Sequence, residues 1–510
     1  MSWGGGNTLA KGLDCVPGAR RYNETPIKNI QENVAIFEGD RMKRRDFLKA
    51  ASVGAAALAV PGCSYVQQRV VRGKKKPNIV YIMLDELAYF ELSCMGNKYL
   101  KTPNIDRMAA EGMRFTQALA GAPVCAPTRS VLMTGQHMGH TTVRTNPGGV
   151  PLRAEDVTVA EVLKEAGYAT GGFGKWGCGD RGTTGVPERH GFDIFFGYYH
   201  QVHAHSYFPN YLVRSGEKVP LEGNTGDFYE GKQFAQYLIF DESIKFIREN
   251  KDRPFFCYCA WTPPHGRWGI PEDEPAWLEF KDKPWPAGQR RPEDAKVYAA
   301  MVKMIDRQIG QIFALLKELE IDDNTLVFVC GDNGGARYFD HFFDSNGPFR
   351  GRKGNLYEGG LRIPMIVRWP GKIKPGVVSD YLWYFPDVMP TLAELAGAKP
   401  PDNIDGISII PTLLGESAAG RKQKKHKFLY WEYKGQTAVR MGDWKAIQPD
   451  KNKAFELYDL SKDIGEENNI AAEHPEILEK MKAYAKQAHT ENIPGGWVDE
   501  EKAFKGHEFH

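Results

Sequence analysis

Two apolar runs of the chain, residues 79–84 and 325–330, each end in side chains that carry oxygen ligands. Carboxylate and amide oxygens in such a group suit Ca²⁺ or Mg²⁺. The sequence has no Cys-x-x-Cys pair and no other ligand spacing of the zinc type. We therefore expect a hard divalent cation, held by Asp85, Glu86, Asp332 and Asn333.

Three further stretches combine a thiol, glycines and cationic side chains. They are residues 125–135 (CAPTRSVLMTG), 167–177 (GYATGGFGKWG) and 350–360 (RGRKGNLYEGG). Lysine and arginine side chains beside a metal site can hold an anion and stabilise charge that develops on it. The combination predicts metal-assisted attack on an anionic ester.

The same stretches carry a family resemblance. Cys-x-Pro-Thr-Arg followed by Leu-Met-Thr-Gly resembles the type I sulfatase signature, and Gly-Tyr-x-Thr with Gly-Lys-Trp resembles the second sulfatase signature. Residues 77–80, which lead to Asp85, resemble the opening strand of that family. The resemblance extends over residues 77–490. It implies a fold like that of alkaline phosphatase and the hydrolysis of sulfate esters, with cleavage of the S–O bond.

The resemblance also implies how the nucleophile is made. Cys125 would be oxidised by a maturation enzyme to formylglycine, and Pro127 and Arg129 match the tag that this enzyme reads. One hydroxyl of the formylglycine hydrate would attack sulfur, and the other would later expel sulfate by restoring the aldehyde. Replacement of Cys125 by serine is expected to abolish activity, because serine lacks the thiol that an aerobic maturation enzyme oxidises.

Other residues match positions with roles in the family. Arg129 would also hold the diol or the metal ligands, Lys175 and Lys353 match lysines on the sulfate oxygens, and His265 matches a histidine near the leaving-group oxygen. The expected Ca²⁺, for which Mg²⁺ is the second choice, would be bound by modified Cys125 and the four oxygen ligands. Glu86 stands where the family often has aspartate, and its longer arm changes the geometry.

One position departs from the family pattern. Many members have histidine two residues after the lysine of Gly-Lys-Trp, where this chain has Gly177. A Gly-Lys-Trp-Gly variant resembles a branch of sulfatases that act on carbohydrates. The candidates for the missing role, and for contact with the substrate, are His137, His140, His200, His203 and His205.

These side chains need a scaffold in which strand ends meet. The apolar run at residues 79–84 predicts a buried strand. Residues 158–161 form a capping box that predicts the start of a helix, and residues 168–173 predict the next strand. A long helix is expected over about residues 292–319. Alternating strands and helices predict an α/β fold, a large mostly parallel sheet flanked by helices, with sites at the C-terminal strand ends.

The C-terminal part has a different pattern. A basic stretch at residues 421–427 predicts a linker or a solvated loop. After it, short strands are expected near residues 428–431, 437–441 and 444–447, followed by a helix over about 475–489. We therefore expect a catalytic domain over residues 77–420 and a small α+β subdomain over residues 428–510.

Composition excludes several classes of protein. The chain has 510 residues, a formal net charge of +2, 25% charged residues and 8 cysteines. This composition excludes a disordered chain and a small domain held together by disulfides. The near-zero net charge gives no positive potential over the whole surface that would attract nucleic acid, so no nucleic acid partner is expected.

The first 76 residues differ from the rest. Residues 44–49 (RRDFLK) and the short apolar run 50–60 resemble a twin-arginine export signal, which implies the export machinery as a partner. Translation is expected to start at Met42, so residues 1–41 would be an extension that is not native, and residues 64–76 a linker. Cys63 follows a loose lipoprotein box. The protein is thus expected in the periplasm or outside the cell, with or without a lipid anchor at Cys63.

Three functions remain open at this point. The first is a sulfatase that acts on a sulfated polysaccharide or its oligosaccharides, as export suggests. The second is a phosphonate monoester or phosphodiester hydrolase of the same superfamily, because the same groups would bind either anion. The third is a sulfoglycan-binding pseudoenzyme, which Gly177 makes conceivable.

Overall fold

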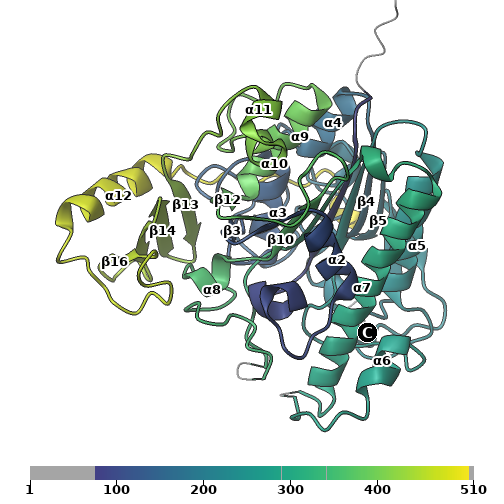
Figure 1. Ribbon diagram of the computed structural model, residues 1–510. Helices are drawn as coiled ribbons and strands as arrows, with labels where there is room; N and C mark the ends of the chain where they lie inside the picture. The colour runs from purple at the N-terminus through teal and green to yellow at the C-terminus, as the bar shows by residue number, and fades with distance from the viewer. Residues whose placement is uncertain (1–74, 289, 340–341, 503, 505–510) are drawn as a thin grey trace, which may run out of the picture. The chain divides into compact units, whose positions relative to one another are not determined.

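The computed structural model describes residues 75–288, 290–339, 342–502 and 504 (Figure 1). The expected export signal, Met42 and Cys63 lie outside the described residues. In the described part of the chain, no helix is long and apolar enough to cross a membrane.

A ten-stranded sheet forms the centre of this part of the chain. Its neighbours pair in parallel from β9 to β5 and between β11 and β2, and they pair antiparallel elsewhere. The predicted mostly parallel α/β sheet is therefore confirmed. In spatial order the strands are β11 (Val377–Ser379), β2 (Met113–Phe115), β10 (Met365–Arg368), β9 (Thr325–Gly331), β1 (Asn78–Leu84), β8 (Phe255–Trp261), β4 (Ala169–Lys175), β5 (Ile194–Tyr198), β6 (Tyr211–Arg214) and β7 (Glu217–Pro220).

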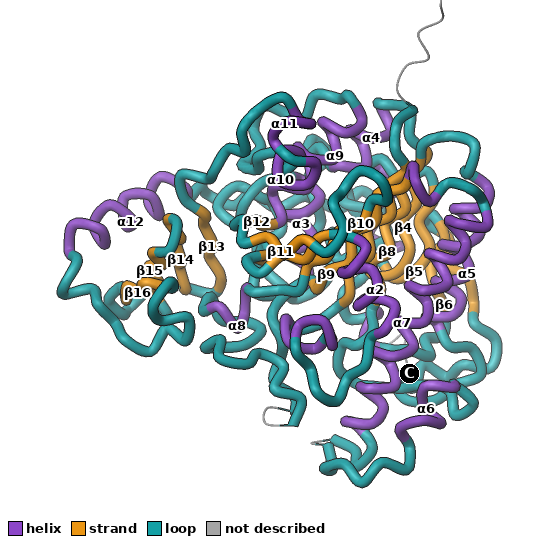
Figure 2. Tube along the Cα trace, in the orientation of Figure 1, coloured by secondary structure: helices purple, strands orange, loops and turns teal. Residues whose placement is uncertain are grey.

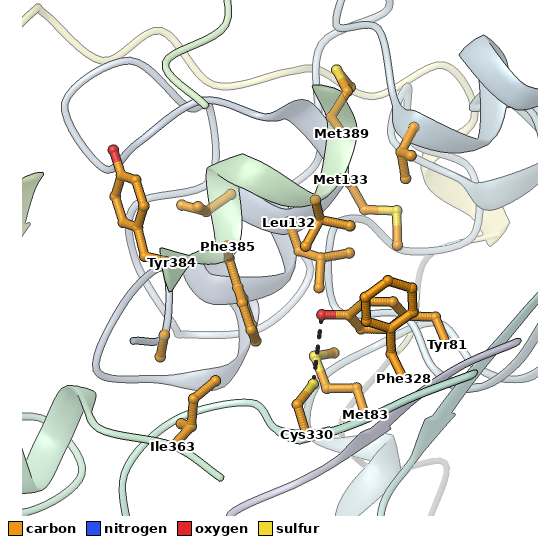
Figure 3. Packing of buried hydrophobic residues seen from close by; sticks show 14 of the residues in the cluster. Tyr81, Met83, Leu132, Met133, Phe328, Cys330, Ile363, Tyr384, Phe385 and Met389 are labelled. Carbon is orange, nitrogen blue, oxygen red and sulfur yellow. Dashed lines mark hydrogen bonds between the residues drawn. The ribbon is translucent and has the colours of Figure 1, made fainter. Parts of the chain in front are cut away.

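The central strands are apolar throughout because both faces of the sheet are covered. Along β1, Ile79, Tyr81 and Met83 belong to one hydrophobic cluster, while the alternating residues belong to another. Figure 3 shows the first cluster, where Tyr81 and Phe328 stack with ring centroids 5.1 Å apart. This burial on two sides explains why the run 79–84 is continuous rather than alternating.

Helices supply the apolar side chains on both faces. The cluster on the Tyr81 side includes side chains of α3 (Cys125–Thr134), α4 (Val159–Glu165) and α9 (Val388–Ala396). The opposite cluster includes α2 (Pro103–Glu111), α5 (Ala235–Glu249) and the 25-residue α7 (Asp294–Glu318). The shorter elements are β3 (Ala118–Leu119), α6 (Pro275–Phe280), α8 (Glu358–Leu361), β12 (Trp383–Tyr384), α10 (Ile410–Leu414) and α11 (Glu416–Ala419).

Helix α4 begins as its sequence predicts. The Thr158 hydroxyl accepts a hydrogen bond from the Glu161 amide, and the Glu161 carboxylate accepts one from the Thr158 amide at 2.8 Å. This reciprocal pair satisfies two amides that the helix itself cannot pair. The helix start is therefore determined locally.

A small antiparallel sheet with one helix forms the C-terminal part, as expected (Figure 2). Residues on one face of this sheet, such as Val439, pack with Met481 and its neighbours on the helix, while Trp431 and Ile447 belong to the main core. The small sheet is thus fastened to the large one by shared apolar burial. Its elements are β13 (Leu429–Tyr433), β14 (Gln436–Met441), β15 (Trp444–Gln448), β16 (Glu456–Asp459) and α12 (Pro475–Ala488).

Buried charges add a second connection between the two sheets. Glu358 of α8 is fully buried and accepts from Arg362 Nε at 2.8 Å and from Lys445 Nζ of β15 at 3.1 Å. Lys445 also pairs with Glu466 at 2.8 Å, and Arg440 Nη1 lies 3.6 Å from Glu358. Burial by itself would raise the pKa of Glu358, but Lys445 above all holds it well below the usual 4.5.

We expect Glu358→Gln to lower the free energy of unfolding by about 3–5 kcal/mol, because it leaves buried cations without their partner. The depressed pKa means that the carboxylate stabilises the wild type fully above about pH 4.5 and loses this effect as the pH falls further. Urea unfolding at pH 7 and pH 4 should therefore show a large gap between wild type and variant that narrows at pH 4. An equal gap at both pH values would contradict this assignment.

Candidate active site

Four neighbouring parallel strands end at one edge of the large sheet. In the order β9, β1, β8 and β4, they place chemical groups at their C-terminal ends. Asp85 follows β1, Lys175 closes β4, Asp332 follows β9, and His265 lies four residues beyond β8. Sites of α/β sheets gather at this edge. The structure therefore brings together residues that are up to 247 positions apart, as between Asp85 and Asp332.

Cys125 is the first residue of α3 and is fully buried. Its Sγ lies 3.2 Å from Asp85 Oδ1 and 3.3 Å from Lys353 Nζ. Burial, and then the Asp85 carboxylate, raise the pKa of the Cys125 thiol well above its usual value. An unmodified thiol at this position is therefore protonated and a poor nucleophile.

Arg129 lies one turn further along α3 and joins two strand ends. Its Nη2 pairs with Asp332 Oδ2 at 3.2 Å, and its Nη1 donates to the Lys175 carbonyl at 2.6 Å. The side chain is fully buried, and Nη2 also lies 3.6 Å from Asp85 Oδ2. The guanidinium thus fixes the acidic residues relative to the start of α3.

Two buried carboxylates face each other in this cluster. Burial would raise the pKa of Asp85, but the Lys175 ammonium, 2.5 Å from Oδ2, is the main cause that holds it well below its usual value. Burial and the charge of Asp85 raise the pKa of Asp332. Two buried carboxylates repel each other when both are ionised, and a bound cation removes this repulsion. Such a pair is therefore typical of a cation site.

The oxygen atoms around these carboxylates suit a hard cation. Glu86 Oε2 and Asn333 Oδ1 are buried and have no hydrogen-bond partner in the structure. Such orphaned oxygens are costly in a protein interior unless a ligand satisfies them. Glu86 also has a φ of 63°, a left-handed conformation that is unfavourable for a residue with a Cβ, and its amide donates to Asp332 Oδ1 at 3.0 Å. The donor set therefore fits Ca²⁺ or Mg²⁺.

Lys353 and His265 form the other side of the cluster. Lys353 Nζ contacts Glu86 Oε1 and lies 3.4 Å from His265 Nε2, which itself lies 3.0 Å from Glu86 Oε1. His265 Nδ1 faces the Gly266 carbonyl at 3.3 Å, while Nε2 faces both a donor, Lys353 Nζ, and an acceptor, Glu86 Oε1. Burial lowers the pKa of His265 to about 4 and that of Lys353 to about 8. This side of the cluster can bind an anion and exchange a proton with it.

The three histidines of residues 200–205 lie in two different surroundings. His205 stacks on His265 with ring centroids 4.6 Å apart and an interplanar angle of 10°, so it joins the cluster. His200 and His203 stack instead on Phe504, at 4.4 and 5.9 Å. The structure therefore brings only His205 of these three to the predicted site through a direct ring contact with its residues.

His137 and His140 lie beyond the opposite end of α3 from Cys125. The ten residues of that helix span about 15 Å. His140 Nδ1 lies 2.9 Å from both oxygens of Asp405, and the two histidine rings stack at 4.2 Å. His137 Nδ1 accepts from the Gly139 amide at 3.1 Å, so Nε2 carries the proton and faces Asp405 at 3.5 Å. The three side chains could be mistaken for a metal site, but the ring of His137 has its only lone pair occupied.

Gly177 leaves little room for a side chain. Its φ is +82°, and a Cβ there would lie 3.0 Å from Gln201 Oε1 and 3.2 Å from Arg129 Cδ. Gln201 is 2% exposed, and its Oε1 has no hydrogen-bond partner. The Gln201 amide thus lies where a side chain at residue 177 would begin. Sequence reasoning missed this residue, although it belongs to the same loop as the histidine candidates.

Family comparison agrees with this geometry. The sulfatase family model matches residues 77–398, and the model described as N-sulphoglucosamine sulphohydrolase, C-terminal, matches residues 349–491. The first match contains all the residues of the cluster, and the second contains the small sheet and α12. The part of the chain with the large sheet and the part with the small sheet therefore each match a family model of sulfatases.

Individual relatives cover most of the chain. Human arylsulfatase A is 33% identical over 462 residues, which cover 80% of this chain and 87% of the relative. The N-acetylgalactosamine-6-sulfatase of Canis lupus familiaris is 32% identical over 430 residues, which cover 78% and 74%. Among solved structures, Ps i-CgsB in complex with k-i-k-neocarrahexaose is similar with a TM-score of 0.68 and 26% identity, over 81% of this chain and 93% of that one.

Proposed function

The chain belongs to the sulfatase family and is a sulfuric ester hydrolase, and we propose that it removes sulfate from a sulfated carbohydrate with a formylglycine derived from Cys125 and a bound Ca²⁺. The observation that carries the proposal is the buried cluster in which Cys125 Sγ lies 3.2 Å from an acid, Asp85, and 3.3 Å from a cation, Lys353. A nucleophile between an acid and a cation is what attack on an anionic ester requires.

The proposed modification of Cys125 supplies a hydrated aldehyde that can attack sulfur and later release sulfate. Asp85 Oδ1 stands within hydrogen-bond distance of the atom at this position, so it can orient a hydroxyl there. The maturation enzyme is a partner under this proposal, because Pro127 and Arg129 complete its recognition tag. Full burial of Cys125 implies that modification precedes folding.

The proposed Ca²⁺ would be held by Asp85, Glu86, Asp332, Asn333 and the modified residue 125, and it would neutralise charge on the sulfate oxygens. The orphaned oxygens of Glu86 and Asn333 support this assignment. Arg129 keeps the two aspartates in position through its contacts with both of them. Lys175 supplies a fixed positive charge at Asp85.

Lys353 and His265 would bind the sulfate group from the other side. Lys353 lies 3.3 Å from Cys125 Sγ and contacts Glu86 as well, and a ring nitrogen of His265 lies within 4.8 Å of that sulfur. The imidazole of His265 would exchange a proton with the leaving oxygen through Nε2, the ring nitrogen that faces Lys353. His205, stacked on His265, would hold that ring in place. Gln201 fills the space beside Gly177 and so would replace the absent histidine in contacts near residue 125.

Carbohydrate is the proposed substrate class for two reasons. Relatives that cover most of the chain include the N-acetylgalactosamine-6-sulfatases, and the similar solved structure contains k-i-k-neocarrahexaose. The twin-arginine pattern at residues 44–49 supports export, and hence contact with extracellular polysaccharide. Under this proposal translation starts at Met42, and the mature protein is periplasmic or extracellular, with Cys63 as a site for a lipid anchor.

Sulfate release tests the proposal directly. The purified protein, matured in a host with a formylglycine-generating enzyme, is incubated with sulfated galactosamine and carrageenan oligosaccharides, an aryl sulfate, a phosphonate monoester and a phosphodiester. We expect sulfate esters to be hydrolysed with a kcat/KM at least about 10²-fold above the phosphorus esters, because the family model and the relatives that cover most of the chain are sulfatases. Faster turnover of either phosphorus ester would favour the alternative hydrolase. No turnover of any ester would favour the binding protein.

A further inference from the structure

A pocket of about 730 Å³ opens between the small sheet, α12 and the segment after α3. Its wall includes the β13–β14 hairpin, one face of α12, and Arg144 and Thr145. None of the sequence motifs and none of the steps proposed above uses it. A pocket of this size can hold one or more sugar rings, and the polar groups that line the pocket determine which sugars bind.

Four lysines line this pocket and make it strongly basic: Lys434, Lys451, Lys482 and Lys486. Among the described residues, no carboxylate pairs with the first, second or fourth of them, while Lys482 bonds Glu479 at 2.8 Å. Two acids also line the pocket, Glu432 and Glu491, against the four lysines and Arg144. Glu432 is already engaged by Arg144 at 3.0 Å and by the Tyr430 hydroxyl at 2.6 Å. The pocket therefore has cations that the protein itself does not neutralise.

The positions of three of these lysines are locally unfavourable for the stability of the fold. Lys482 and Lys486 lie four residues apart on one face of α12, where like charges repel each other. Lys434 is at the tip of the hairpin with a φ of +46°, followed by Gly435 at +78°. Turns of this type favour Asn or Gly at the first position, and a lysine there costs about 1 kcal/mol. A concentration of charge that costs stability points to a ligand of opposite charge.

Two hydrogen bonds connect the wall of the pocket with backbone next to the catalytic cluster. Gln436, which lines the pocket, donates from Nε2 to the carbonyl of Gly354 at 2.8 Å, and Gly354 follows Lys353. In the second, Asn146 Oδ1 accepts from the amide of Ala126 at 3.2 Å, next to Cys125, and Thr145 lines the pocket. The two hydrogen bonds thus connect the wall of the pocket with the residues beside Lys353 and Cys125, which places the pocket near the catalytic cluster.

We propose that this pocket binds a second anionic group, a sulfate or carboxylate on a neighbouring sugar, while the sulfate to be removed lies at Cys125. The inference rests on the proposed function and narrows its substrate class to carbohydrates that carry several anionic groups. Tyr433 and Phe455 in the pocket wall would contact the sugar rings, and the lysines would bind the anion.

The test removes the unpaired charges and compares two substrates. The variant Lys434→Gln/Lys451→Gln/Lys486→Gln is assayed on a polysulfated oligosaccharide and on a small aryl sulfate, which cannot reach the pocket. The matched control is Lys422→Gln/Lys425→Gln/Lys480→Gln, which removes three exposed charges that do not line the pocket. We expect the ratio of kcat/KM, oligosaccharide over aryl sulfate, to fall about ten-fold in the pocket variant only.

Ionic strength gives a second readout. Raising salt from about 50 to 500 mM should bring the ratio for the wild type close to that of the pocket variant, because exposed charges are screened. An unchanged ratio in the pocket variant, or an equal fall in the control variant, would overturn the inference. Failure of the proposed function is recognised separately, since the wild type would then hydrolyse neither substrate.

Discussion

Replacing Cys125 by alanine should lower kcat for sulfate esters by at least about 10³-fold, since it removes the nucleophile that the proposed chemistry requires. Cys125→Ser should be equally inactive when the protein is matured by an aerobic enzyme that oxidises thiols. The side chain at this position lies within 3.3 Å of both Asp85 and Lys353, in the centre of the proposed site. Initial rates on an aryl sulfate, with circular dichroism to verify folding, measure the effect.

The control for this pair is Cys257→Ala. Cys257 is also fully buried, but it lies in the middle of β8 and its Sγ contacts Cys259. Its loss should reduce stability by no more than a few kcal/mol and leave kcat within about two-fold. Substantial turnover by Cys125→Ala would show that residue 125 is not the nucleophile. Activity of Cys125→Ser is compatible with the account only if the host has a maturation enzyme for serine.

Loss of the cation should have the second largest effect. Treatment with a chelator is expected to reduce kcat by about 10²–10³-fold, with recovery on addition of Ca²⁺. Asp332→Asn should show a similar loss that Ca²⁺ does not reverse, because it removes a buried carboxylate that faces Asp85 and pairs with Arg129 at 3.2 Å. Thermal unfolding of the wild type should also shift upward with Ca²⁺, and the shift should shrink in the variant.

A matched control for this experiment is Asp193→Asn. Asp193 is also an aspartate at a strand end of the large sheet, but it precedes β5, at the end of the strands opposite the site, where it is exposed and pairs with Lys164 at 2.8 Å. Its variant should keep both the activity and the Ca²⁺-dependent shift. Full activity of the wild type after complete removal of divalent ions, or an unaltered Ca²⁺ shift in Asp332→Asn, would contradict the proposed metal site.

Much of the scaffold could be predicted from local patterns. The strands around residues 79–84 and 325–330 are continuous apolar runs, which have few other interpretations in an α/β chain. Helix α4 has a complete capping box, and α7 has an apolar face over seven turns. Because parallel strands share one C-terminal edge, the proximity of Asp85 and Asp332 followed from the same patterns.

The parts that could not be predicted depend on contacts between distant segments. His200 and His203 looked like site residues, but they stack on Phe504, about 300 positions away. His137 and His140 are held by Asp405, which no local pattern connects with them. Gln201 lies beside Gly177 because the loop after β5 crosses the end of β4, and nothing in a glutamine's identity signals this.

The basic pocket was hidden for the same reason. Its lysines come from a hairpin tip, a loop and a helix spread over residues 434–486, and none of them forms a run in the sequence. The basic stretch that is visible as a run, residues 421–427, contributes nothing to that pocket. A near-neutral chain can thus hold a local concentration of positive charge that its total charge of +2 conceals.

The mass of one tryptic peptide tests the central claim most directly. Trypsin should release residues 115–129 (FTQALAGAPVCAPTR) from protein purified from its native host. The account predicts a peptide in which the Cys125 thiol is replaced by an aldehyde, trapped by reaction with a hydrazine, in proportion to specific activity. Fully active protein that gives only the unmodified, alkylatable thiol would contradict it.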